Sequence, residues 1–463
     1  MLGLVALLLQ WIWRKSRAPD RHAGGGALRF HPMTYTASDA DGHRAMALAL
    51  RVGELLLGSG EATENVGGAM RRILEAYGMR HVEADVNLSA ITLSHVPDDG
   101  RAATTAERRV RRRQPDYDRL IAVHTLVGEI ASQGLSLGET QERLREITRR
   151  VKVYPDWLAV TALALISASA AVLIGGGPIV AAAAFVATVA GDRAGAWLAR
   201  RGVPEFFQTA LAASFGALVA VLLIWQDVAV QASAVVVGAV IALLPGRPLV
   251  AAVQDGIAGE YVTATARLTE IIFIVSAVIS GIGSMLTLAV SLGVRITVDN
   301  VPAAPLTLAP PQLAGAIGVS LTFAVALLVP PRHLLPGAIG GGLIWTTFVL
   351  LVWNGAPAVV ATALASAVIG LAGTAYARLV RVPATVFVIP AIGPLLPGSA
   401  LYRGLLELSI GELSVGTLHL IEALSLALGI GAGVIVGAEM FRAFLGRDLA
   451  RRIRPASRRT RGY

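Results

Sequence analysis

Two stretches of this 463-residue chain place acidic side chains at matching positions within an apolar region. LLPGRPLVAAVQDGIAGEYVTATARLTE runs from Leu243 to Glu270, and LLPGSALYRGLLELSIGELSVGTLHLIE runs from Leu395 to Glu422. At an offset of 152, without gaps, segments 243–284 and 395–436 are identical at eleven positions. Unrelated apolar helices often share Leu and Ala, but they rarely share a Leu-Pro-Gly break and acids in register. The pattern indicates an internal duplication.

The Pro-Gly pairs in the two copies, Pro245-Gly246 and Pro397-Gly398, predict a backbone interruption at the same place in each. Proline has no N–H and kinks or stops a helix, and glycine tolerates the conformations that follow. The N–H and C=O groups freed by such a break are tolerated at membrane depth only inside protein or beside water. Free helix ends of this kind can bind the carboxylate and ammonium of a zwitterion.

The repeated acids are candidates for moving charge. An ionised side chain at the bilayer centre costs roughly 2.5–3.5 kcal/mol, so a buried glutamate tends to keep its proton and can carry it. The alternative is a position at a helix end in the headgroup region; for Asp255 and Glu407, on more polar stretches, both interpretations stay open. We expect the functional role for the two glutamates inside apolar runs, Glu270 and Glu422. The full set of candidates is Glu260, Glu270, Glu412 and Glu422.

Two basic residues precede an acid by three positions, in the pairs Arg267–Glu270 and His419–Glu422. This spacing puts both members on one helix face, where they could share a proton or form a plain ion pair. A metal site would want three or four ligands, and these helices hold no second histidine, so we predict no metal. The chain has neither an ATP-binding GxxxxGK[ST] motif nor a protease HExxH motif, so transport would run on an ion gradient.

Composition indicates a polytopic membrane protein, because 54% of residues are hydrophobic, 15% are charged and the mean hydropathy is +0.64. Cysteine is absent, which excludes disulfides, cysteine-based zinc sites and thiol nucleophiles. Lys and Arg number 40 against 31 Asp and Glu, but this bias does not predict nucleic-acid binding. The apolar run at 1–13 is too short to span a bilayer; we expect an interfacial anchor or an over-extended start.

The chain divides near residue 156 into a polar and an apolar part. The expected segments are an N-terminal extension at 1–37, an α+β cytoplasmic domain at 38–156, a first transmembrane repeat at 157–290, a linker at 291–311, a second repeat at 312–445 and a basic tail at 446–463. Apolar periodicity predicts helices at about 46–57, 63–78 (capped by Thr63), 117–133 and 137–150. Alternation predicts strands at 81–88 and 89–96, and the arginine-rich 108–113 is a candidate for a third.

Apolar runs predict ten membrane spans, at about 157–174, 178–199, 206–225, 228–244, 262–290, 312–329, 333–353, 357–377, 383–396 and 415–445. Every arginine-rich loop falls on one side if both termini are cytoplasmic. The same offset superimposes the first five spans on the last five. Because five is odd, the second copy enters the membrane from the side opposite to the first. We therefore predict a polytopic α-helical membrane protein of ten transmembrane helices in two inverted five-helix repeats, with a small α+β cytoplasmic domain. Gly429, Gly433 and Gly437 form a predicted packing stripe.

Two motifs resemble the threonine/serine exporter family. LALRVGELLLGSGEATENVGGAMRRILEAYGMRHVEADVNLSAITLSH is similar to the opening signature of that family, and VFVIPAIGPLLPGSALYRGLLELSIGE to its C-terminal half. The resemblance covers roughly residues 44–445. It implies a multi-pass protein of the bacterial cytoplasmic membrane that exports L-threonine and L-serine on the proton-motive force. The implied partners are a small amino acid, protons and the lipid bilayer, with no cofactor; the oligomeric state stays open.

By the motifs, the residues that carry over are Glu54, Ser59, Gly60 and Glu64 of the soluble domain, and Pro397, Gly398, Ser399, Tyr402 and Glu412 of the second half. A plainer interpretation makes Glu54 and Glu64 a solvated helix face and Gly60 a turn.

Three alternatives remain beside a proton-exchanging exporter. One is a carrier for another small metabolite, such as a dicarboxylate. Another is a membrane-bound hydrolase that uses the soluble domain, which offers His81, His95 and His124 with Glu54, Ser59 and Asp85 but no GxSxG elbow. The third is a receptor or scaffold, which the twofold acid pattern disfavours.

Overall fold

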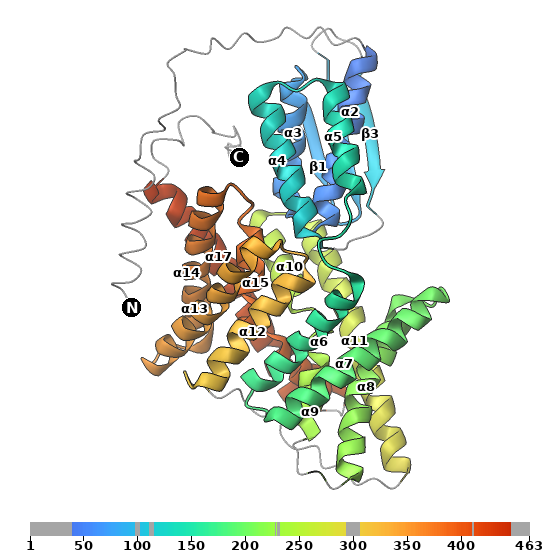
Figure 1. The fold of residues 1–463 in the computed structure, drawn as a ribbon, viewed down its shortest axis with the longest axis vertical. Coiled ribbons are helices and arrows are strands. Elements are labelled where there is room, and N and C mark those ends of the chain that lie inside the picture. Colours follow the sequence, from blue (N-terminus) through green and yellow to red (C-terminus); the bar gives the residue numbers. More distant parts are fainter. Residues whose placement is uncertain are drawn as a thin grey trace.

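A computed structural model describes residues 39–97, 102–110, 115–226, 228, 232–292, 306–409 and 412–445. The predicted extension at 1–37 and the tail at 446–463 lie outside these residues. Figure 1 shows two parts, an N-terminal region of helices and strands that stands on one end of a larger all-helical part.

The N-terminal region combines four helices with a three-stranded antiparallel sheet of order β1-β2-β3, and α2 and α3 pack against that sheet. Its elements are α2 (Asp39–Gly58), α3 (Thr63–Ala76), β1 (Val82–Val86), β2 (Ala90–His95), β3 (Thr104–Arg109), α4 (Tyr117–Gln133) and α5 (Leu137–Arg149). Alternating side chains of the central strand, Ile91 and Leu93, are fully buried, as are Met70 and Ile73 of α3. Every second residue of the strand and every third or fourth residue of the helix thus face one shared core.

Two details of this region differ from the sequence-based expectation. Thr63 does not cap α3: it is the first helical residue, and the capping position, Ala62, makes no side-chain capping bond. The Glu61 carboxylate accepts the Ala62 N–H instead, at 3.3 Å. The third strand ends at Arg109 rather than spanning 108–113, and residues 111–114 lie outside the described part. The strands predicted at 81–88 and 89–96 are confirmed as β1 and β2.

The all-helical part contains two successive series of helices. The first is α6 (Asp156–Leu173), α7 (Pro178–Arg200), α8 (Glu205–Trp225), α9 (Ala232–Val240), α10 (Gly246–Ala258) and α11 (Tyr261–Ser291). The second is α12 (Pro310–Ala326), α13 (Leu334–Trp353), α14 (Ala358–Val380), α15 (Thr385–Ala391), α16 (Gly398–Ser409) and α17 (Leu413–Leu445), with short 3-10 turns at Pro331–His333 and Gly393–Leu395. At the offset of 152, each helix of the first series has a counterpart in the second, in the same order.

Seven helices in the described residues are long and apolar enough to cross a membrane, or eight if the bent pair Thr385–Ala391 and Gly393–Gly404 is one span. The ten predicted spans are therefore not reached by length and composition. The missing two are the run at 228–244, where the described helix α9 has nine residues, and the run at 312–329, where α12 has 17. A straight helix needs about 20 residues to cross the hydrocarbon core.

The glycine stripe of α17 is a packing surface, as predicted. A Cβ built on Gly433 would lie 2.2 Å from the Ala363 carbonyl oxygen, and one on Gly437 would lie 2.0 Å from that of Ala367, both in α14. The first series repeats this arrangement, because a Cβ on Gly281 of α11 would lie 2.0 Å from the Ala210 oxygen of α8. In both series a long last helix is thus held in backbone contact with the third.

Candidate functional site

The two Leu-Pro-Gly breaks lie against each other. A Cβ placed on Gly246 would be 3.1 Å from the Leu396 Cβ, and one placed on Gly398 would be 3.8 Å from the Leu244 Cβ. The offset converts Gly246 into Gly398 and Leu396 into Leu244, so the two contacts are reciprocal. Reciprocal contacts between equivalent residues are what a twofold axis produces at an interface.

Backbone bonds around the breaks are repeated as well. The N–H of Gly246 donates to the Leu244 carbonyl at 2.9 Å, and that of Gly398 donates to Leu396 at 2.8 Å. Further along, the N–H of Glu260 reaches the Asp255 carbonyl and that of Glu412 reaches the Glu407 carbonyl, both at 2.9 Å. The duplication seen in the letters is therefore a duplication of backbone conformation.

Each copy also joins a basic and an acidic residue across the turn that follows the amphipathic helix. Arg267 Nε donates to Asp255 Oδ2 at 2.7 Å, and His419 Nδ1 lies 2.6 Å from Glu407 Oε2. These are the equivalent positions of the two copies. The Asp255 side chain is 7% exposed, so its contact with Arg267 is a buried pair that ties α10 to α11. Asp255 and Glu407 therefore each join the amphipathic helix to the long helix that follows it.

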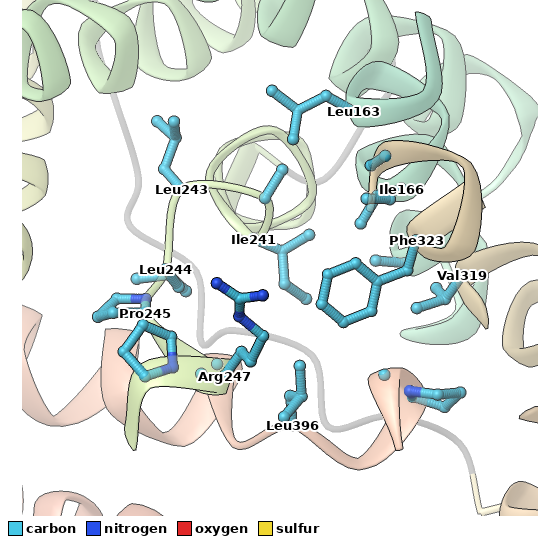
Figure 2. Close-up of a pocket in the computed structure, with 18 of the residues that line it drawn as sticks. Leu163, Ile166, Ile241, Leu243, Leu244, Pro245, Arg247, Val319, Phe323 and Leu396 are labelled. Carbon is cyan, nitrogen blue, oxygen red and sulfur yellow. The ribbon is translucent and has the colours of Figure 1, made fainter. Parts of the chain in front are cut away.

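A cavity of about 380 Å³ lies between the two breaks. This volume is within the range of small-molecule sites, about 300–1,000 Å³. Residues 241–248 of the first break and Gly393, Pro394, Leu396 and Gly398 of the second line it, and α6, α11, α12 and Pro115 of the N-terminal region complete the wall. Of the described residues that line it, Arg247 alone is charged. Figure 2 shows its guanidinium projecting among Ile241, Leu244, Phe323 and Leu396.

The first break also frees backbone carbonyls at the cavity wall. The Ile241 carbonyl has no donor four residues on, because Pro245 has no N–H. The Ala242 carbonyl loses its usual donor too, since the Gly246 N–H goes to Leu244 instead. Both Ile241 and Ala242 line the cavity. The site therefore combines one cation with carbonyl oxygens that are not used by a continuing helix.

The N-terminal region is docked directly over this part of the bundle. The N–H of Tyr117 donates to the Leu327 carbonyl at 3.0 Å, and that of Asp118 donates to Leu328 at 3.2 Å. The first turn of α4 thus satisfies carbonyls that the end of α12 leaves unpaired. The Tyr154 hydroxyl donates to the Val329 carbonyl at 2.8 Å. One apolar core continues across the junction, from Val123 and its neighbours to Leu327 and Val329.

A buried polar cluster of the N-terminal region reaches Arg247. The Glu61 carboxylate, 1% exposed, lies 2.9 Å from His124 Nε2 and accepts from Asn65 Nδ2 at 2.7 Å. The Arg247 side chain hydrogen-bonds the hydroxyl of Tyr117, and the charge of Glu61 also acts on that hydroxyl. A Cβ on Gly60 would lie 3.8 Å from an Arg247 nitrogen. The guanidinium therefore borders both the cavity and the N-terminal region.

Burial and partners shift two pKa values in this cluster. Burial acts to raise the pKa of Glu61, but the hydrogen bonds and charge of His124, with Asn65 and the Ala62 N–H, lower it below its ordinary value. Burial raises the pKa of Tyr117 to about 12, although the charge of Arg247 opposes this. Glu61 is therefore ionised and Tyr117 neutral near neutral pH.

The predicted acids lie elsewhere. Glu270 and Glu422 are exposed on the surface of the single chain, at equivalent positions of α11 and α17, as is Glu412; Glu260 is half-buried. None of the four lines the cavity between the breaks. Of the second-half motif residues, Tyr402 is buried, Ser399 is half-buried, and Pro397 and Gly398 form the break itself.

The soluble-domain motif residues have mixed roles. Glu54 accepts from Arg51 at 2.6 Å and pairs with Arg108 of β3, so it ties α2 to the sheet. Gly60 has φ +93°, the turn conformation that favours glycine, and Glu64 is exposed. Ser59 is buried at 3% exposure. In the hydrolase alternative His124 would activate a nucleophile. In the structure its Nε2 lies 2.9 Å from the Glu61 carboxylate.

Three site residues were not singled out from the sequence, namely Arg247, Tyr117 and Glu61. Arg247 directly follows the first Leu-Pro-Gly, and Glu61 follows Gly60 inside the soluble-domain motif. The motifs therefore pointed to the neighbourhood of Arg247 and Glu61, but no sequence spacing links the three residues to one another. They meet only because α4 docks over the first break.

The fold and cavity define a polytopic membrane protein with a ligand-sized cavity between two related halves. The family described as "Putative threonine/serine exporter" matches residues 47–289, and the one described as "Threonine/Serine exporter, ThrE" matches residues 312–440. The chain belongs to the threonine/serine exporter family.

Two curated relatives agree with this assignment. A "Probable threonine/serine exporter" of Mycobacterium tuberculosis is 31% identical over 411 residues, covering 86% of this chain and 77% of the relative. A "Threonine/serine exporter" of Corynebacterium glutamicum is 27% identical over 403 residues, covering 85% and 81%. No solved structure matches. The family and the apolar helices make this chain a multi-pass membrane protein with bacterial relatives.

Proposed function

We propose that this chain exports L-threonine and L-serine out of the cytoplasm in exchange for protons, through the cavity between the two breaks. The names of its relatives support the substrate. The observation that carries the proposal is the reciprocal contact of Gly246 with Leu396 and of Gly398 with Leu244 beside that cavity. A ligand held where two equivalent halves meet can be exposed to either side when the halves tilt.

The two halves act as inverted five-span repeats, with both termini in the cytoplasm. The repeated hydrogen bonds around the breaks support the duplication. The arginine-rich loops support the orientation, because positive residues near span ends favour the cytoplasmic side. The short helices α9 and α15, each followed by a break, form the interrupted spans that such carriers place beside their substrate.

The N-terminal region gates the cytoplasmic mouth of the cavity. Pro115 contributes to the cavity wall, and the first turn of α4 is bonded to the end of α12. This placement supports a lid that must shift before a substrate can enter from the cytoplasm.

Proton exchange uses Glu270 and Glu422. They occupy equivalent positions on α11 and α17, and uninterrupted apolar runs follow both. Carboxyl groups within membrane-spanning helices act as proton relays in pumps and transporters. Their position outside the cavity means that proton and substrate follow separate routes and are coupled through movement of α11 and α17.

The test is efflux from cells loaded with a threonine-containing dipeptide. We expect the wild type to release threonine and serine in an uncoupler-sensitive manner. Glu270→Gln and Glu422→Gln should each slow this efflux several-fold, since an amide cannot carry a proton. Glu439→Gln is the matched control, because Glu439 is exposed on the same helix as Glu422 and pairs with Arg442.

If both variants keep the wild-type rate of efflux and an uncoupler does not change that rate, the assignment of proton exchange to Glu270 and Glu422 is wrong. Release of a dicarboxylate in place of threonine and serine would remove the substrate assignment. Turnover of a generic ester or peptide by the purified chain would instead favour the hydrolase.

A further inference from the structure

Arg247 is the charged residue at the cavity for which the proposed function has no role yet. It is half-buried, and no carboxylate of the described residues forms an ion pair with it. Its bonded neighbour is the neutral hydroxyl of Tyr117. Its guanidinium projects into a space walled by Ile241, Leu244, Phe323 and Leu396 (Figure 2).

A guanidinium in such surroundings favours an anionic ligand. Apolar walls lower the local dielectric, so an approaching carboxylate gains more from the charge than it would in water. The planar fork of arginine also matches the two oxygens of a carboxylate. The single cation among the described lining residues can pair with one carboxylate. No second cation among them is present to pair with a second carboxylate.

We propose that Arg247 binds the α-carboxylate of the transported molecule and thereby selects ligands with one free carboxylate. The inference rests on the proposed function for the identity of the substrate, and it names the side chain that recognises it. The carbonyls of Ile241 and Ala242 receive the α-ammonium, which explains how a cavity with no acid among its described lining residues holds a zwitterion.

Tyr117 is the positioning residue. The charges of Arg247 and of the buried Glu61 both act on its hydroxyl, and a Cβ built on Gly60, next to Glu61, would lie 3.8 Å from an Arg247 nitrogen. When the N-terminal region is docked, Arg247 is therefore oriented toward the cavity before the ligand arrives. Pre-orientation lowers the entropy lost on binding.

The first experiment compares acids with their uncharged amides. Thermal shifts of the purified full-length chain in detergent are titrated with L-threonine and L-threoninamide, and with succinate and succinamide. From these titrations, the wild type should bind L-threonine with an apparent affinity at least tenfold higher than that for its amide. Arg247→Gln should lose this preference, and Arg247→Lys should keep part of it, because lysine retains the charge but not the fork.

Arg201→Gln is the matched control, since it removes one positive charge at an exposed site stacked on Trp197. It should bind like the wild type. If acids and amides behave alike in the wild type, including no shift with either, the inference is overturned. An acid preference that survives in Arg247→Gln overturns it too. Stabilisation by succinate but not threonine, lost in Arg247→Gln, would overturn both the proposed substrate and the selection for a single carboxylate, and would leave only the carboxylate-binding role of Arg247.

Tyr117→Phe separates positioning from folding. In the efflux assay it should raise the apparent KM for threonine several-fold with the maximal rate nearly unchanged, because the guanidinium is still present but less well oriented. Equal losses in maximal rate and protein abundance would assign Tyr117 to folding alone and overturn its positioning role.

Discussion

At the scale of single residues, Glu61 is a carboxylate that solvent barely reaches. Glu61 is 1% exposed and depends on His124 and Asn65 for its hydrogen bonds. It also stands just before α3, where the positive end of the helix favours an anion. Loss of its charge would leave buried donors with a weaker acceptor, which typically costs about 1–3 kcal/mol.

We therefore expect Glu61→Gln to lower the melting temperature of the full chain near neutral pH. The folded pKa of Glu61 is lower than its ordinary 4.5, so its ionisation contributes stability above pH 4.5. That contribution is lost as pH falls from 4.5 through the lower folded pKa. The gap in melting temperature between wild type and Glu61→Gln should thus close in acid.

Glu64→Gln, three residues along the same segment and exposed, serves as the control and should show no gap at any pH. A gap that persists unchanged below pH 4.5 would contradict the assignment of the effect to the charge of Glu61.

At the scale of elements, glycines decide how closely the long helices approach. Two glycines of α11 differ sharply: a Cβ on Gly281 would meet the Ala210 carbonyl of α8 at 2.0 Å, whereas one on Gly283 would meet nothing within 4 Å. Both are interior helix positions with the same propensity gain from alanine, about 0.8–1.0 kcal/mol. Any difference between them therefore measures packing.

We expect Gly281→Ala to destabilise the chain and Gly283→Ala to leave it unchanged or slightly stabilised. The added methyl at Gly281 must push α11 from α8, and overpacking of this kind costs about 1–3 kcal/mol or more. Thermal unfolding of both variants in detergent is the measurement. Equal melting temperatures would mean that the α8–α11 contact is looser than the backbone indicates.

At the scale of the whole molecule, function depends on the two breaks meeting. The chain has no cysteine, so pairs can be introduced without background. The Cβ positions of Leu244 and Gly398 are 3.8 Å apart, close to the mean separation in disulfides, about 3.8 Å. This places a crosslink between the two halves at the wall of the cavity.

Leu244→Cys combined with Gly398→Cys should therefore form a disulfide on oxidation, detectable by mass in a non-reducing digest. Threonine efflux should fall while the bond is intact and return with reductant, because a tied pair of breaks cannot tilt apart. The two single-cysteine variants are the controls and should ignore oxidant. Full transport in the crosslinked protein would show that the breaks do not move relative to each other.

Much of this molecule follows from local patterns. Hydropathy predicts the membrane class, alternation predicts β1 and β2, and the repeated Leu-Pro-Gly predicts both the duplication and the interruptions, because proline chemistry acts on its own backbone. The family was recognisable from the motifs because a motif is a local pattern of the sequence. Even the glycine stripe of α17 could be predicted, since a period of 3.6 places its members on one face.

What only the tertiary structure decided is which distant groups meet. Arg247, Tyr117 and Glu61 lie in α10, in α4 and in the loop before α3, and their contact depends on how the N-terminal region docks, which no spacing along the chain records. The partner of Arg267 is Asp255 across a turn, and Glu270 and Glu422 face outward, because the face a helix buries is set by its neighbours. Pairing and exposure are properties of packing, whereas breaks and periodicity are properties of the chain.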